Sequence, residues 1–265
     1  MASPRRQWGR LVSSGNRDAD ELPEGGSADL WADGWRAMGH ADHNEAVEAH
    51  IERHFGHAKT VIHEVLSKWI HLDINVIPPS RDRDFTTYVT NGMSDLPMSI
   101  PPGVIDDPAE WAYAELVAAL PGPPEDHVLD GGEHYVIEAL RMFGRYVHAE
   151  DTWVRLGHTL RADEKPGPIG PDTDLAAYLL AFPIATALTD SEAASVLDIG
   201  SGRHVHFYAL FAIHPDELKL AMREGSLSLV DRLEQRRVTE VYDPRRPSSL
   251  ERRPGLDLSR FFRRR

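Results

Sequence analysis

The sequence Ile-His-Leu-Asp-Ile-Asn-Val-Ile-Pro-Pro at residues 70–79 gives the clearest strand signal in this chain. From Ile70 to Val76, apolar side chains alternate with polar ones such as His71 and Asp73, and Pro78-Pro79 ends the run. Strict alternation is typical of a strand with one side toward the core, and proline cannot continue a ladder. We therefore predict a strand over 70–76 with one buried face and one face in water.

The same kinds of signal extend outward from this strand. Further strands are predicted at Phe85–Thr90, Trp111–Leu120, Ala176–Pro183 and Val205–Ile213, and helices at 43–55, Glu133–Val147, Pro215–Glu224 and Leu227–Arg236. The first helix rests on apolar residues recurring every four positions until Gly56, a glycine suited to the end of a helix. Strands and helices do not alternate strictly, so we predict an α+β fold with a mainly antiparallel β-sheet flanked by helices.

Composition indicates a folded protein of a reducing compartment. The 265 residues are enough to bury a core, and there is no cysteine for disulfides, thiolate nucleophiles or thiolate-bound zinc. The longest apolar stretch, Leu175–Leu188, contains Pro183 and is shorter than the roughly 20 residues that span a bilayer. The polar first residues are unlike a secretory signal. We expect a cytoplasmic protein without a membrane partner.

Three segments are predicted along the chain. Residues 1–40 are rich in Gly, Ser, Asp and Glu, with Trp8, Trp31 and Trp35 as the only strong anchors, and should form a flexible N-terminal segment. Residues 41–246 carry the folded domain, and residues 247–265 form a basic C-terminal tail.

The charge is distributed unevenly. Eight arginines oppose two acids from Arg245 onward, which gives that end +6 of the net −13 and leaves residues 1–244 with −19. So acidic a body repels phosphate backbones, which makes nucleic acid an unlikely ligand and a basic protein a plausible one. The charge does not indicate an oligomeric state.

A series of short motifs, in order from about His50 to Arg246, resembles the Suppressor of fused domain. They are His54-Phe55-Gly56, Glu64, Leu72-Asp73-Ile74 with Pro78-Pro79, Val89–Met98, Tyr113–Leu116, Asp151–Trp153, Gly157–Leu160, Phe207-Tyr208, Asp216–Leu218 and Gly225. One such motif alone would mean little, whereas the ordered set is specific.

The resemblance implies a protein-binding function without catalysis or cofactor. Animal members restrain Gli-type transcription factors, and shorter bacterial members often resemble immunity proteins that neutralise toxins encoded beside them. The loop Asn91–Asp95 is similar to the bacterial kind. The resemblance therefore favours an immunity protein or antitoxin over a regulatory scaffold with an endogenous partner, and the acidic charge of residues 1–244 makes a basic toxin a plausible target.

Two interpretations of the loop after the second predicted strand stay open. In the functional one, Met93, Ser94, Asp95 and Met98 form an exposed, adaptable rim that binds the partner, with Trp153 and His158 nearby. In the structural one, Asn91-Gly92 is a tight turn and the loop is architecture. A structural role is expected for the remaining motif residues, which are His54, Gly56, Asp73, Pro79, Gly92, Glu115, Gly157 and Glu217.

One enzyme motif competes with this interpretation. Val196–Gly202 resembles the first motif of S-adenosylmethionine-dependent methyltransferases, in which a strand and a glycine turn lead into a helix. The segment that follows, Val205–Ile213, has the pattern of a strand, and too few residues remain for the missing βα units. We therefore expect a Gly-Ser-Gly hairpin and no enzyme activity.

Fourteen histidines raise the question of a metal site. His204 with His206, and His71 with Asp73, could each supply two ligands from one face of a strand. His50 and His54 lie one helical turn apart, with His57 and His63 nearby, but no glutamate completes an HExxH motif. No pattern supplies a full ligand set, so the sequence predicts no metal site.

Overall fold

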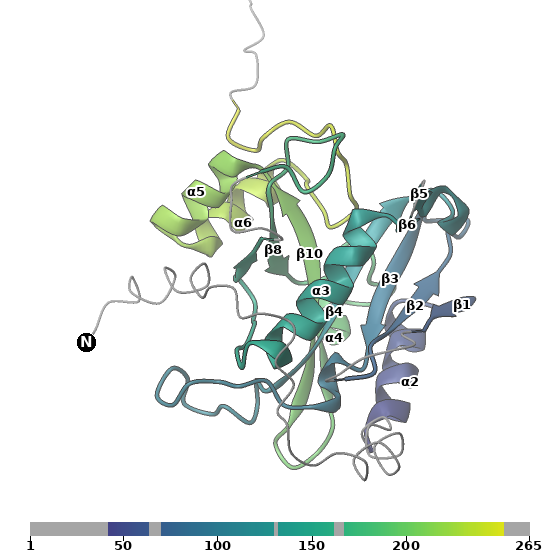
Figure 1. Ribbon diagram of the computed structural model, residues 1–265, viewed down its shortest axis with the longest axis vertical. Coiled ribbons are helices and arrows are strands. Elements are labelled where there is room, and N and C mark those ends of the chain that lie inside the picture. Colours follow the sequence, from purple (N-terminus) through teal and green to yellow (C-terminus); the bar gives the residue numbers. More distant parts are fainter. Residues whose placement is uncertain (1–41, 64–69, 130–131, 162–166, 252–265) are drawn as a thin grey trace, which may run out of the picture.

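The computed structural model describes residues 42–63, 70–129, 132–161 and 167–251. These residues form an eight-stranded sheet in the order β1-β2-β3-β4-β10-β8-β7, with β9 also paired to β10 (Figure 1). Among the described pairings of named strands, β10 with β4 is parallel and the others are antiparallel. The predicted α+β fold with a mainly antiparallel sheet is confirmed.

Each predicted strand and helix is present, with ends displaced by at most three residues. The strands are β1 Thr60–Ile62, β2 Asp73–Ile77, β3 Phe85–Asn91, β4 Tyr113–Pro121, β5 Val128–Leu129, β6 Gly132–Glu133, β7 Thr159–Leu160, β8 Ala177–Ala181, β9 Val196–Asp198 and β10 His204–Ile213. The helices are α2 Asn44–His54, α3 Tyr135–Ala149, α4 Ser191–Ser195, α5 Pro215–Glu224 and α6 Ser226–Gln235, with 3-10 turns η2 Met93–Asp95 and η3 Pro124–His127. None of these helices combines the length and apolar character needed to cross a membrane.

Helices cover both faces of the sheet and divide the core in two. Helix α3 crosses one face of the sheet (Figure 1). On that face Leu140 and Phe143 pack with Tyr178 of β8. The opposite face packs against α2, α4, α5 and α6 through residues such as Phe55 and Phe207. Side chains on both faces of the sheet are therefore buried.

This two-sided cover corrects the prediction of a water-facing side on β2. All five residues of β2 are buried, including Asp73 at 6% and Asn75 at 9% exposure. Ile74 and Val76 pack in the α3 core, whereas Ile77 packs in the α2 core. The polar side chains interrupt an interior face, so their alternation with apolar ones did not mean exposure to water.

The predicted boundary between domain and basic tail lies too early in the chain. Ser248 and Ser249 are buried against α5. Ser248 Oγ donates to Asp216 Oδ2 at 2.7 Å, and Ser249 N donates to Glu217 Oε1 at 2.7 Å. The folded domain thus includes the chain at least to Ser249. The predicted flexible segment 1–40, with its three tryptophans, lies outside the described residues, as do Glu64 and residues 252–265.

Candidate partner-binding site

The loop after β3 begins with a glycine that its surroundings require. Gly92 has φ +120°, a conformation that other residues rarely adopt. A Cβ at this position would lie 1.9 Å from the backbone oxygen of His71. Gly92 therefore lets the chain pass closely over the segment before β2 and turn into η2, in agreement with the tight turn predicted at Asn91-Gly92.

A buried carboxylate organises this loop. Glu115 on β4 has no exposed surface. Its Oε1 accepts from Gly92 N at 3.0 Å, Ser94 N at 2.9 Å and Ser94 Oγ at 2.6 Å, and its Oε2 accepts from Thr90 Oγ1 at 2.6 Å. Burial raises the pKa of Glu115, although the hydrogen bonds from Ser94, Thr90 and Gly92 oppose that shift. The turn is thus fixed by a satisfied interior network.

Two histidines hold the outer side of the turn. His148 Nε2 of α3 lies 2.9 Å from Met93 O, and His43 Nε2 lies 3.0 Å from Ser94 O. Burial lowers the pKa of His148, despite its contact with the Met93 carbonyl and the nearby Asp95 charge. His148 is accordingly neutral at pH 7 and donates one N–H to that carbonyl.

The prediction of an exposed rim is wrong for three of its four residues. Met93, Ser94 and Met98 are 0%, 1% and 4% exposed, because both methionines pack in the α3 core and Ser94 faces Glu115. Asp95 is half-buried, and only Leu96 and Pro97 of this stretch are exposed, Leu96 at 45%. The architectural interpretation fits the inner part of the loop.

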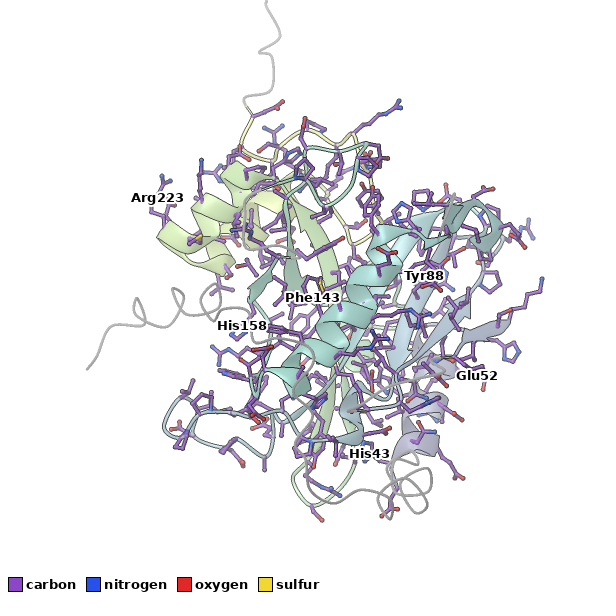
Figure 2. All side chains as sticks on the ribbon, viewed as in Figure 1. His43, Glu52, Tyr88, Phe143, His158 and Arg223 are labelled. Atoms are coloured by element: carbon purple, nitrogen blue, oxygen red, sulfur yellow. The ribbon has the colours of Figure 1, made fainter. Side chains whose placement is uncertain are left out.

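Trp153 and His158 lie next to the same region. Ser99 N donates to Thr152 O at 3.2 Å, which joins the end of the loop to the segment before Trp153. Trp153 is 9% exposed, and its ring lies 5.0 Å from that of His158. Burial and the Arg155 charge lower the pKa of His158 to about 4. Figure 2 shows His158 beside α3, on the β8 side of the molecule.

The exposed feature here is one that the sequence analysis missed. Residues 95–110, called the acidic loop below, contain Asp95, Asp106, Asp107 and Glu110 and no lysine or arginine. Asp106 and Asp107 are exposed, and the loop extends away from the sheet at the lower left of Figure 1. The sequence signal that could have identified this loop is its four acidic residues and four prolines, with no basic residue among them.

The acidic loop is anchored where it returns to the sheet. Met98 N donates to Ala112 O at 2.7 Å. His206 Nε2 of β10 lies 3.0 Å from Glu110 O, and the His206 ring stacks on Trp111 with centroids 4.5 Å apart. His206, one of the two β10 histidines considered and set aside as metal ligands, is thus used for packing. The acidic loop is a projecting segment on a fixed base.

Several motif residues connect separate elements of the fold. His54 Nδ1 lies 2.6 Å from Thr189 Oγ1, and Gly56, with φ +121°, ends the turn after α2. Gly157, with φ +84°, donates its N–H to Leu180 O at 2.8 Å and accepts from Ser226 Oγ. Pro79 is half-buried just after β2.

Two other motif carboxylates, Glu217 and Asp73, contact basic side chains. Glu217 is fully buried, and its Oε1 accepts from Arg246 Nη1 at 2.9 Å. Asp73 contacts two imidazoles, His63 Nδ1 at 2.9 Å and His71 Nε2 at 3.0 Å. The sequence did not associate His63 with this pair, or Arg246 with Glu217.

The segment that resembles a methyltransferase motif is a β-hairpin. β9 pairs antiparallel with β10 through Asp198 and His204, Leu197 and Val205, and Val196 and His206. Gly200, Ser201 and Gly202 all have positive φ and form the connecting turn. No helix follows the glycines, so the strand-turn-helix context that a cofactor site of this kind needs is missing here.

Comparison with known proteins agrees with this architecture. A family model described as Suppressor of fused protein (SUFU) matches residues 68–247. A structure described as a SUFU homolog from Neisseria gonorrhoeae FA 1090 has a TM-score of 0.55 at 16% identity, covering 80% of this chain and 99% of its own. The structure described as the Sufu-Fu complex has a TM-score of 0.52 at 14% identity, covering 78% and 91%. A search of curated proteins gave no match. Because the family model spans more than half of the residues, this chain belongs to the Suppressor of fused family.

Proposed function

We propose that this chain is a protein-binding module that acts as an immunity protein, neutralising a basic toxin by direct binding and not by catalysis. The observation that carries the proposal is the acidic loop, which contains four acids and no lysine or arginine and exposes Asp106 and Asp107, in a chain whose residues 1–244 carry a net charge of −19. A related structure is described as the Sufu-Fu complex, which supports partner binding as a use of this fold.

Electrostatic attraction would set the rate of binding, and direct side-chain contacts would set the affinity. An acidic surface raises the encounter rate with a basic partner, while affinity comes mainly from a few desolvated side chains. Leu96, 45% exposed at the start of the acidic loop, is the apolar residue best placed to serve as such an anchor. The proposed partner-binding residues are therefore Leu96 and the acidic residues of the acidic loop, in place of the buried Met93 and Met98.

A neutralisation assay tests the biological role. The product of a neighbouring gene should arrest growth when expressed alone, and co-expression of this chain should restore growth. A stable complex with a harmless neighbour would instead assign the chain to a regulatory scaffold. If no neighbour is toxic, or if this chain gives no protection, the immunity function is refuted.

Removing charge from the acidic loop should slow association with that partner. The double variant Asp106→Asn/Asp107→Asn should lower the on-rate at low salt by roughly threefold or more, because steering depends on local charge. The off-rate and the melting temperature should change little, since both side chains are exposed. Surface plasmon resonance over a series of salt concentrations measures the rates.

A matched variant controls for net charge alone. Asp82→Asn/Asp84→Asn removes the same charge from exposed positions before β3, at the opposite end of that strand from the turn at Gly92. This control should retain most of the wild-type on-rate. Equal slowing in both double variants would mean that only the overall charge matters and that the acidic loop is not the binding surface.

A further inference from the structure

Three potential metal ligands converge at the β1 edge of the sheet. His63 follows β1 directly, and Asp73 is the first residue of β2. The antiparallel register pairs Ile62 with Ile74, so the next positions outward, 63 and 73, lie opposite each other. His71 is two residues before Asp73. One ligand atom from each of the three residues lies within 4.8 Å of the other two.

The carboxylate occupies the centre of this cluster. Asp73 Oδ2 lies 2.9 Å from His63 Nδ1, and Asp73 Oδ1 lies 3.0 Å from His71 Nε2. The carboxylate thus gathers two imidazole nitrogens around itself, and an ion bound by the three side chains would replace these two contacts.

The fold holds the inner part of the cluster in place. Asp73 pairs with Asn91 of β3, so its backbone is fixed in the ladder. The carbonyl of His71 lies against Gly92, so closely that a Cβ there would be only 1.9 Å away. Ligands on restrained backbone lose less entropy when they order around an ion.

Exposure within the cluster provides a route for an ion. The side chain of Asp73 is 9% exposed, that of His71 35% and that of His63 68%. The buried carboxylate thus forms the floor and the imidazoles the open side. Among the described residues no further histidine or carboxylate joins this group, and water or a bound molecule can add ligands.

We propose that His63, His71 and Asp73 form a binding site for a divalent transition-metal ion, with Zn²⁺ as the principal candidate. Two imidazoles and a carboxylate are a ligand set that zinc uses when it keeps an open position, and one that also suits Fe²⁺. Each imidazole coordinates through the nitrogen that now faces Asp73. The proton of that nitrogen moves to the other ring nitrogen through water, or is released if the ring is cationic.

At this edge of the sheet the sequence analysis found only the pair His71 and Asp73, and it predicted no metal site because no pattern supplied a full ligand set. Pairing of β1 with β2 supplies the third ligand, His63, from ten residues away. The inference is independent of the proposed immunity function, since the ligands are not in the acidic loop.

Zinc binding by the full chain, freed of metal by chelator and dialysis, tests the site. Calorimetric titration with ZnCl₂ should give one ion per chain, and zinc should raise the melting temperature. Co²⁺ should give visible d–d absorption, which Zn²⁺ then displaces. His63→Gln should weaken zinc binding at least about tenfold and leave the melting temperature of the metal-free protein unchanged, because His63 is largely exposed.

A second exposed histidine serves as the matched control. His57 Nδ1 lies 3.1 Å from Glu52 Oε1, with side chains 83% and 67% exposed, and is a simple histidine–carboxylate pair. His57→Gln should bind zinc as the wild type does. Absence of stoichiometric binding, or equal loss of affinity in the His57 and His63 variants, would refute the site and leave only adventitious binding by surface histidines.

Discussion

Glu115→Ala is expected to lower the free energy of unfolding by about 3–5 kcal/mol, because it leaves several buried donors without an acceptor. Glu115 accepts four hydrogen bonds and is completely buried. Two of its donors are backbone or side-chain groups of Ser94, and another is the N–H of Gly92. Denaturant unfolding followed by circular dichroism measures the loss.

Glu115→Gln is the matched variant that separates charge from hydrogen bonding. The glutamine oxygen can accept from Gly92 and Ser94, while its amide can donate to Thr90 Oγ1. Thr90 Oγ1 can in turn donate to Leu116 O, which lies 3.4 Å away. This variant should therefore keep most of the stability that the alanine variant loses.

The stability of the wild type and that of Glu115→Gln should also depend differently on pH. Burial raises the pKa of Glu115 above its ordinary value of 4.5. A raised pKa in the folded state gives a contribution that is complete below the unfolded pKa and is lost as pH rises through the folded pKa. As the pH rises through the folded-state pKa of Glu115, the wild type should lose stability relative to Glu115→Gln. A glutamine variant as unstable as the alanine variant would show that the network requires the carboxylate itself.

Local pattern was sufficient to predict the longer elements of this fold, whereas the short elements β1, β5, β6, β7 and α4 were not predicted. The alternation around Asp73, the spacing of apolar residues before Gly56, and Pro215 at the start of α5 each indicate local backbone conformation, and each element is present. Burial was predicted less well. The alternation in β2 is the same whether its polar side faces water or an interior network, and only the packing of helices on both faces decides between these cases.

The candidate site depended on contacts that a single sequence does not reveal. Met93 was interpreted as an adaptable surface residue, yet methionine fits an irregular core equally well, and here it packs under α3. Pairing of β1 with β2 brings His63 to Asp73, and the return of the chain to α5 brings Arg246 to Glu217. The acidic residues of the acidic loop are visible in the sequence, but they belong to no recognised binding motif.

The contact of Arg246 with Glu217 joins the end of the described chain to α5. Arg246 Nη1 donates to Glu217 Oε1 at 2.9 Å, and its Nη2 donates both to Glu217 Oε2 at 2.5 Å and to Ala212 O at 2.7 Å. Glu217 also accepts from His214 N at 2.8 Å and Ser249 N at 2.7 Å. The pair is therefore both buried and nearly saturated with hydrogen bonds.

Arg246→Met is expected to cost about 3–5 kcal/mol of unfolding free energy, since it leaves a buried carboxylate without its cation. Arg245→Met is the control, because Arg245 is the exposed neighbour in the sequence and its loss should change stability by less than about 0.5 kcal/mol. Thermal and denaturant unfolding of the two variants provide the comparison. Equal stability of the two variants would mean that the buried pair contributes nothing beyond its desolvation.

The pH dependence identifies the ionic part of this effect. Burial alone raises the pKa of Glu217, but hydrogen bonds and charge from Arg246, with the N–H groups of His214 and Ser249, outweigh it and lower the pKa below 4.5. A lowered pKa contributes stability that is present above the unfolded value and is lost as pH falls through the folded one. In Arg246→Met the largest opposing contribution is gone, so burial should dominate and the acid-side loss should shrink or reverse. An acid-side slope identical to that of the wild type would contradict the assignment of the lowered pKa to Arg246.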